Sequence, residues 1–142
     1  MKHTMANNIG IEASAPKKAC QDDKCPFHGS IKVRGRQHTG TVVSTKMRRS
    51  AVVQWEHKHF IPKYERYERR HTKITVHAPD CLDVKEGDMV RIAETRPLSK
   101  TKNFTVIENL GGEKGYALKK EGREAGKAVK KELKKEDDNE AS

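Results

Sequence analysis

Short runs in the middle of the chain alternate apolar and polar residues, which is the pattern of a half-buried β-strand. The runs Thr41–Ser44 and Ala51–Trp55 flank the basic turn Lys46–Ser50 and predict a β-hairpin. Three further runs of this kind are Lys73–His77, Asp88–Ala93 and Asn103–Ile107. Because Gly, Pro or Asp bounds these runs, the pattern predicts five short strands.

The predicted strands favour a closed all-β architecture. No convincing amphipathic helix interrupts them, which argues against a parallel sheet built from strand–helix–strand units. Five antiparallel strands within residues 31–112 can bury their edges by closing into a barrel. We therefore expect a five-stranded OB-fold barrel, although an SH3-like barrel fits the strand count almost as well.

Charge and composition divide the chain of 142 residues into three parts. We expect an irregular N-terminal extension over residues 1–30, the barrel over 31–112 and a charged C-terminal tail over 113–142. The barrel segment holds 17 basic and 9 acidic side chains and carries most of the net charge of +10. Such a basic domain is typical of proteins that bind polyanions, most often nucleic acid, although a merely solvated surface has the same composition.

The tail is rich in Lys, Glu, Ala and Leu from residue 116 to residue 136. These residues favour a helix, which Gly122 and Gly126 weaken. Its apolar stripe is thin, so the helix would be marginal by itself in water. The tail is expected either to fluctuate as a solubilising segment or to become a helix on docking against RNA or a protein.

The connection Pro62–His71 between the second and third predicted strands is unusually basic. It has five basic residues and two tyrosines, and it is too polar for a core and too long for a tight turn. A projecting arm of this composition suits structured RNA, because Lys and Arg neutralise phosphates and Tyr or Arg planes stack on unpaired bases. A solvated turn of helix in which Glu65 pairs with Arg69 is the alternative, and it is compatible with a projecting arm.

The connection Arg96–Phe104 between the last two predicted strands presents cations and hydroxyls. Pro97 lacks an N–H group and ends the preceding ladder. The residues from Ser99 to Lys102 then offer two lysines and two hydroxyls, groups that hold a phosphate backbone. In an OB-fold this connection is one of the loops that contact oligonucleotides, and a solvated turn is the alternative.

The run Gly87–Lys102, GDMVRIAETRPLSKTK, resembles the signature of universal small-subunit ribosomal protein seventeen. Segments similar to the archaeal and eukaryotic branch of that family are Cys25–Gly29, Val33–Arg36, Thr39–Val43, Tyr64–His71 and Val76–Pro79. The resemblance extends over residues 8–110. It implies an OB-fold that binds small-subunit ribosomal RNA early in assembly, in the 5′ domain, through loops and extensions.

The resemblance and the charge pattern point to the same basic loops as RNA contacts. The candidate RNA-binding residues are Arg34, Arg36, Lys46, Arg48, Arg49, Lys63, Tyr64, Arg66, Arg69, Arg70, His71, Arg96, Ser99, Lys100, Thr101 and Lys102. The implied partners are small-subunit ribosomal RNA and neighbouring small-subunit ribosomal proteins, in the cytoplasmic ribosome. We expect no catalytic function, no cofactor, no membrane contact and no small-molecule substrate.

Two other classes of function remain open at this stage. The first is a free-standing OB-fold binder of single-stranded nucleic acid, of the cold-shock or initiation-factor type. Such proteins stack bases on aromatic side chains, and here only Trp55, Phe60 and Phe104 lie on or beside predicted strands. The second is a zinc-dependent interaction module.

The zinc hypothesis depends on Cys20, Cys25 and His28, which lie within nine residues and are ligand types that zinc accepts. Paired CxxC knuckles are absent, and a fourth ligand would have to come from Cys81 or His77 through the fold. We therefore expect reduced structural cysteines and no metal. The absence of an orienting group or oxyanion signal also argues against a Cys/His nucleophile.

The odd number of cysteines, in a chain without export signals, indicates reduced thiols or a metal site before disulfides. No apolar run approaches the length of a membrane span, and the first ten residues do not resemble a signal peptide. We expect a cytosolic protein.

Overall fold

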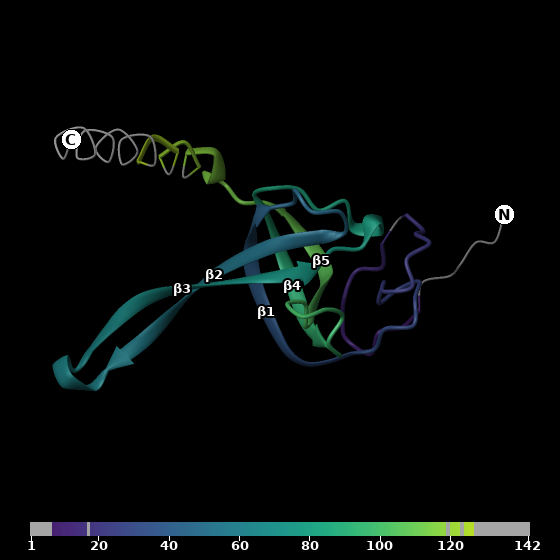
Figure 1. The fold of residues 1–142 in the computed structure, drawn as a ribbon, viewed down its shortest axis with the longest axis horizontal. Helices are drawn as coiled ribbons and strands as arrows, with labels where there is room; N and C mark the ends of the chain where they lie inside the picture. The colour runs from purple at the N-terminus through teal and green to yellow at the C-terminus, as the bar shows by residue number, and fades with distance from the viewer. Residues whose placement is uncertain (1–6, 17, 119, 123, 127–142) are drawn as a thin grey trace, which may run out of the picture. The chain divides into compact units, whose positions relative to one another are not determined.

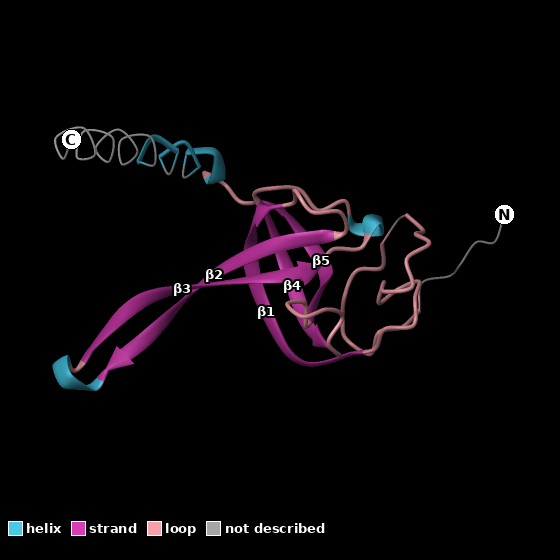
Figure 2. Ribbon diagram, in the orientation of Figure 1, coloured by secondary structure: helices cyan, strands magenta, loops and turns pink. Residues whose placement is uncertain are grey.

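The computed structural model describes residues 7–16, 18–118, 120–122 and 124–126. Five strands form a closed barrel in the order β1-β2-β3-β5-β4 (Figures 1 and 2). The strands are β1 (Val33–Ser44), β2 (Ser50–Ile61), β3 (Arg66–His77), β4 (Asp88–Thr95) and β5 (Phe104–Gly112). Two short 3-10 helices, η1 (Pro62–Tyr64) and η2 (Asp80–Leu82), follow β2 and β3. The predicted five-stranded OB-type barrel is confirmed.

The expectation that all strands pair antiparallel is wrong at one position. β3 and β5 run parallel, with His77 opposite Thr105, whereas the other four pairs are antiparallel. A ring with an odd number of strands cannot reverse direction at every pairing. Closure of five strands therefore requires at least one parallel pair.

Strand β1 closes the ring because it pairs with two neighbours. Its first part, from Val33 to Thr41, lies against β4, and its last part, from Thr41 to Ser44, lies against β2. Gly40 precedes the residue shared by both ladders. A Cβ atom there would lie 2.8 Å from the carbonyl oxygen of Gln54 and 2.8 Å from a methyl carbon of Val53, so this close approach excludes a side chain.

All five strands contribute inward residues to the barrel interior. In β2 and β3 these residues come only from the halves that lie within the barrel. The fully buried members of this core are Val42, Ala51, Val53, Val76, Val90, Ile92 and Val106. Their spacing follows the two-residue period expected when one strand face is buried. The alternation in the sequence therefore identifies the core correctly.

A second apolar cluster covers the outer face of β4 and β5. Cys25 and Phe27 of the N-terminal segment are buried there against Ala93 and Ile107, and Cys81 completes the cluster. Ala93 and Ile107 each follow an inward residue, so both faces of these two strands are buried. The N-terminal segment thus belongs to the hydrophobic structure of the barrel.

Polar contacts fasten this segment at its edge. The Arg91 guanidinium donates to the Glu12 carbonyl and forms a 2.8 Å ion pair with Glu108. A hydrogen bond from the Ser14 hydroxyl, together with the charge of Arg91, lowers the pKa of the Glu108 carboxyl.

The chain divides into two compact units, Met1–Gly112 and Glu113–Ser142. In the second unit the described residues from 116 to 126 are helical, and residues 127–142 of the predicted tail lie outside the described residues. Among the helices that the structure describes, none has the length and apolar character needed to cross a membrane.

We predict that Ile92→Ala lowers the free energy of unfolding by about 2–5 kcal/mol, because Ile92 is fully buried and its truncation leaves a cavity. Met89 lies on the same strand with 38% of its surface exposed, so Met89→Ala should cost less than about 1 kcal/mol. Urea denaturation of both variants measures the difference. Equal losses would contradict the assignment of Ile92 to the core.

Candidate nucleic-acid interface

The outer halves of β2 and β3 project from the barrel as a two-stranded ribbon, called the arm here and comprising residues 56–71 (Figure 1). The ladder continues without interruption from Ser50 opposite His77 to Ile61 opposite Arg66. The predicted projecting arm is therefore present as a β-hairpin. A helical turn is present only at the tip, in the 3-10 helix η1, and it does not include Glu65 with Arg69, because residues 66–71 are extended.

The turn at the tip follows from its sequence. Pro62 occupies the first position of η1, where its fixed φ fits the helix. The N–H at this position has no partner within a helix, so proline loses no hydrogen bond there. Glu65 ends the turn in the left-handed region with φ 49°, and its backbone N–H donates to the carbonyl oxygen of Pro62.

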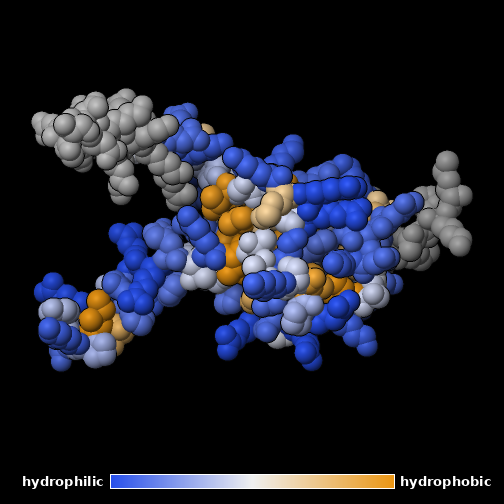
Figure 3. Space-filling view, in the orientation of Figure 1, coloured by the Kyte–Doolittle hydropathy of each residue, from blue (hydrophilic) through white to orange (hydrophobic). Residues whose placement is uncertain are grey.

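One face of the arm combines cations with aromatic rings. Opposed residues of an antiparallel pair share a face, so Lys58 with Arg69 and Phe60 with Tyr67 lie on the same side. The rings of Phe60 and Tyr67 are tilted with centroids 5.1 Å apart, yet 44% and 69% of these residues remain exposed. Figure 3 shows a hydrophobic patch near the tip of an otherwise hydrophilic arm. These rings offer flat surfaces that a folded core would normally bury.

The remaining predicted arm residues are also exposed, but several have partners within the arm. Lys63 lies over the Tyr64 ring at 5.4 Å, and Arg70 pairs with Glu68. His71 lies 3.5 Å from the Glu56 carboxylate and also contacts the amide of Gln54, just before the arm, at 3.2 Å. Arg66 and Arg69 are exposed at the surface of the ribbon.

A second group of predicted residues gathers around the loop between β4 and β5. The loop is closed by a 2.8 Å hydrogen bond from the Leu98 N–H to the Lys102 carbonyl. Lys102 also donates through its ammonium to the Ser50 hydroxyl, next to the turn between β1 and β2. At the other side the loop follows Thr95, which pairs with Val33 at the start of β1.

This loop therefore connects the two other predicted basic segments, and we call the three together the barrel patch. Its exposed residues are Arg34, Arg36, Lys46, Arg48, Arg96, Ser99, Lys100 and Thr101. The arm and the barrel patch are separate groups, so the structure distributes the predicted site residues over two surfaces.

Arg49 differs from the other predicted contacts. Its guanidinium donates to Asp80 at 2.9 Å and lies 3.8 Å from the buried carboxylate of Asp22. The hydrogen bond to Asp80 raises the pKa of Arg49 above its usual value. Asp22 in turn lies 2.8 Å from the Nε2 atom of His77. Arg49 thus links the β1–β2 turn to the N-terminal segment.

The predicted RNA contacts omit Lys58, Phe60 and Tyr67, although Phe60 was considered as a stacking ring for the single-strand alternative. The predicted second strand stops at Trp55, because polar residues on both faces hide the alternation beyond that point. The length of the partner strand is the signal that could have found Lys58 and Phe60. Because β3 starts at Arg66, its outer half requires an equally long stretch of β2 before Pro62.

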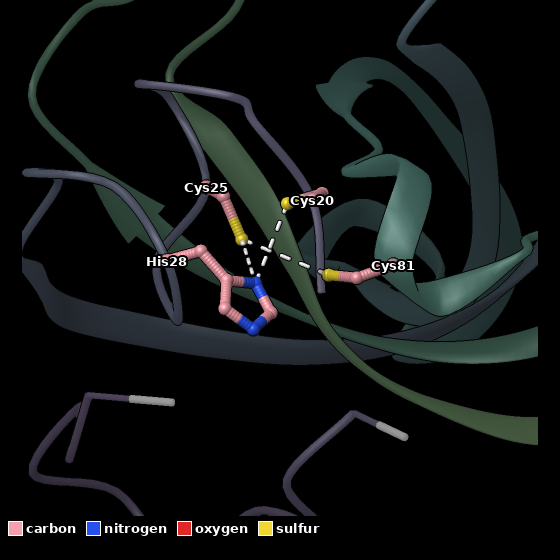
Figure 4. A group of neighbouring side chains, drawn as sticks. All are labelled: Cys20, Cys25, His28 and Cys81. Atoms are coloured by element: carbon pink, nitrogen blue, oxygen red, sulfur yellow. Dashed lines mark hydrogen bonds between the residues drawn. The ribbon is translucent and has the colours of Figure 1, made fainter. Parts of the chain in front are cut away.

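The structure also brings together all three cysteines and His28 (Figure 4). Burial raises the pKa of the Cys20 thiol. A hydrogen bond with Cys81, aided by the backbone N–H groups of His28 and Phe27, lowers the pKa of Cys25 to about 5. The same hydrogen bond raises the pKa of the Cys81 thiol. These four side chains could together bind a metal ion that prefers thiolate and imidazole ligands.

Comparison with known proteins gives consistent matches. The family model described as ribosomal protein S17 matches residues 40–108. The small ribosomal subunit protein uS17 of Methanospirillum hungatei is 55% identical over 104 residues, which cover 73% of this chain and 96% of that protein. The uS17 protein of Methanocaldococcus jannaschii is 50% identical over 106 residues, covering 75% of this chain and 91% of that protein. Both relatives are archaeal.

We predict that Arg49→Gln lowers the melting temperature more than Arg48→Gln does, because it removes two partly exposed ion pairs. Arg48→Gln is the matched control, since Arg48 is exposed in the same turn, and it should change stability by less than about 0.5 kcal/mol. Thermal unfolding of both variants provides the comparison. If Arg48→Gln were the more damaging change, the assignment of Arg49 to the internal link would be wrong.

Proposed function

Because the chain belongs to the ribosomal protein S17 family, we propose that it is a structural protein of the small ribosomal subunit that binds small-subunit ribosomal RNA. The membership confirms the family resemblance that the sequence motifs indicated. The family is not one of enzymes, in agreement with the expectation of no catalytic function. The proposed target within the RNA is the 5′ domain.

The observation that carries the RNA proposal is the cationic and aromatic face of the arm. Lys58 and Arg69 can each neutralise a phosphate, and the exposed rings of Phe60 and Tyr67 can stack on unpaired bases. A ribbon that leaves the barrel can enter a space between RNA helices, where a closed barrel would not fit. The arm therefore serves as the penetrating contact.

The barrel patch supplies the second contact. Its cations lie on the irregular first part of β1, at Arg34 and Arg36, and on the closed loop at Lys100, where Ser99 and Thr101 add hydroxyls. Hydroxyls and ammonium groups of this kind position a phosphate backbone without reading its sequence. Two contacts on one protein would hold neighbouring RNA helices in a single arrangement, which is how the protein would support assembly.

Neighbouring small-subunit ribosomal proteins are the further partners under this proposal, and the ribosome is the location. A free-standing single-strand binder is the less favoured function, because family membership and the projecting arm both point to structured ribosomal RNA. Trp55 and Phe104 do not form an open stacking platform, since both pack against the barrel core.

We predict that Lys58→Gln combined with Arg69→Gln weakens binding to a transcript of the 5′ domain. Each lost phosphate contact should reduce the slope of log K against log salt by about 0.7–0.9. The matched control replaces Lys85 and Lys114 by Gln. Both lysines are exposed outside the proposed surfaces, and together they carry the same charge as Lys58 and Arg69. Filter binding at several salt concentrations measures both slopes. A slope equally reduced in the control would mean that net charge, not the arm, determines the affinity.

We predict that trypsin cleaves the free protein rapidly at Arg66, Arg69 or Arg70. A ribbon of two strands is marginally stable without further packing, so its backbone opens readily. Bound 5′-domain RNA should slow these cleavages at least tenfold, whereas an unrelated RNA of equal length should not. Mass spectrometry of the fragments identifies the sites. Equal rates with both RNAs would remove the arm from the specific interface.

A further inference from the structure

Three thiols and one imidazole converge from three separate segments of the unit Met1–Gly112. Cys20 lies before a turn, Cys25 and His28 lie within it, and Cys81 lies in η2 after β3. Figure 4 shows the three sulfurs and the imidazole directed toward one another. One ligand atom from each residue lies within 4.8 Å of all the others. Cys81 supplies the fourth ligand that the sequence alone could not identify.

Three of the six separations are close to the edges of a coordination tetrahedron, and all six are within 4.8 Å. Zinc bonds of about 2.3 Å to sulfur and about 2.0–2.1 Å to nitrogen place two sulfurs about 3.8 Å apart and a sulfur and nitrogen about 3.6 Å apart. The Cys25 and Cys81 sulfurs are 3.7 Å apart. His28 Nδ1 lies 3.4 Å from the Cys20 sulfur and 3.6 Å from the Cys25 sulfur.

The turn Cys25–Gly29 brings the His28 imidazole toward the Cys25 thiol. The Gly29 N–H donates to the Cys25 carbonyl at 2.9 Å, which brings His28 back toward the Cys25 sulfur. Gly29 has no room for a side chain, because a Cβ atom would overlap the backbone of Asp23. The turn therefore closes tightly on the segment that begins with Cys20.

The environment suits a structural ion. Cys25 and Cys81 are buried, with 0% and 5% of their surfaces exposed, and they lie in the apolar cluster beside β4 and β5. Three thiolates and one zinc ion leave a single negative charge. His77, the other residue considered as a ligand, is instead hydrogen-bonded to Asp22.

We propose that Cys20, Cys25, His28 and Cys81 form a structural zinc site that joins the N-terminal segment to η2. Three thiolates and one imidazole give four protein ligands and no open position, which is the composition of structural and not catalytic zinc sites. The ion supports the fold by linking Cys20 to Cys81, far apart in the sequence, and by fastening the cover on the outer face of β4 and β5. This proposal replaces the expectation of reduced cysteines without metal.

Metal analysis of the full chain tests the proposal. Protein purified under reducing conditions, or refolded with Zn²⁺ and dialysed, should retain one zinc per chain by native mass spectrometry. Substituting Co²⁺ should give the intense ligand-field bands and thiolate charge-transfer absorption of a tetrahedral site. A folded chain that retains no zinc after this treatment, or a weak octahedral cobalt spectrum, would overturn the proposal. A disulfide between Cys25 and Cys81 under the same reducing conditions would also overturn it.

Variants assign the ligands individually. His28→Ala should weaken zinc binding at least tenfold, whereas His28→Cys should restore stoichiometric binding because it provides a set of four thiolates. Cys81→Ser should likewise lose the ion. His71→Ala is the matched control, since it removes an exposed imidazole of the arm and should leave one zinc bound. If Cys81→Ser does not fold, the cobalt spectra of His28→Cys and the natural chain still test the site. The spectra should differ because a fourth thiolate replaces the imidazole, and identical spectra would exclude His28 as a ligand.

Discussion

Barrel closure depends on one strand, β1, pairing with β2 over its last residues and with β4 over its earlier ones. The change of partner occurs at Thr41, next to Gly40, where the strands approach too closely for a side chain. Closure removes exposed edges, which would otherwise be available for pairing with other chains. It also forces one parallel pair, between β3 and β5, because the ring has five members.

Closure divides β2 and β3 into two functional parts. Their inner halves supply Val53 and Val76 to the core, whereas their outer halves have no third strand to pair with and continue as the arm. The same two strands thus provide hydrophobic stability and a polar projection. This division explains how a chain with only 33% hydrophobic residues still builds a complete core.

Cations in this protein have two kinds of role. Arg49, Arg91 and Lys102 bond to other parts of the chain, and each connects segments far apart in the sequence. Lys58, Arg69 and Lys100 project into solvent and are the charges proposed to meet RNA. Net charge alone treats these residues as equivalent. Their difference arises from which carboxylates and hydroxyls the fold places beside them, because a cation already paired loses part of its attraction for phosphate.

Residue pattern by itself determined the strand count, the barrel and the family, because alternation and the GDMVRIAETRPLSKTK motif are local properties of the chain. The basic arm was also predictable, since its composition excludes burial. Its true length was not, because exposure of both faces removes the alternation that marks a strand. Contacts across long separations could not be inferred either: Cys81 lies beside Cys20, Cys25 and His28 although β1, β2 and β3 separate them in the sequence. The tertiary structure alone decided this, because the meeting of the ligands depends on barrel closure and not on any spacing in the sequence.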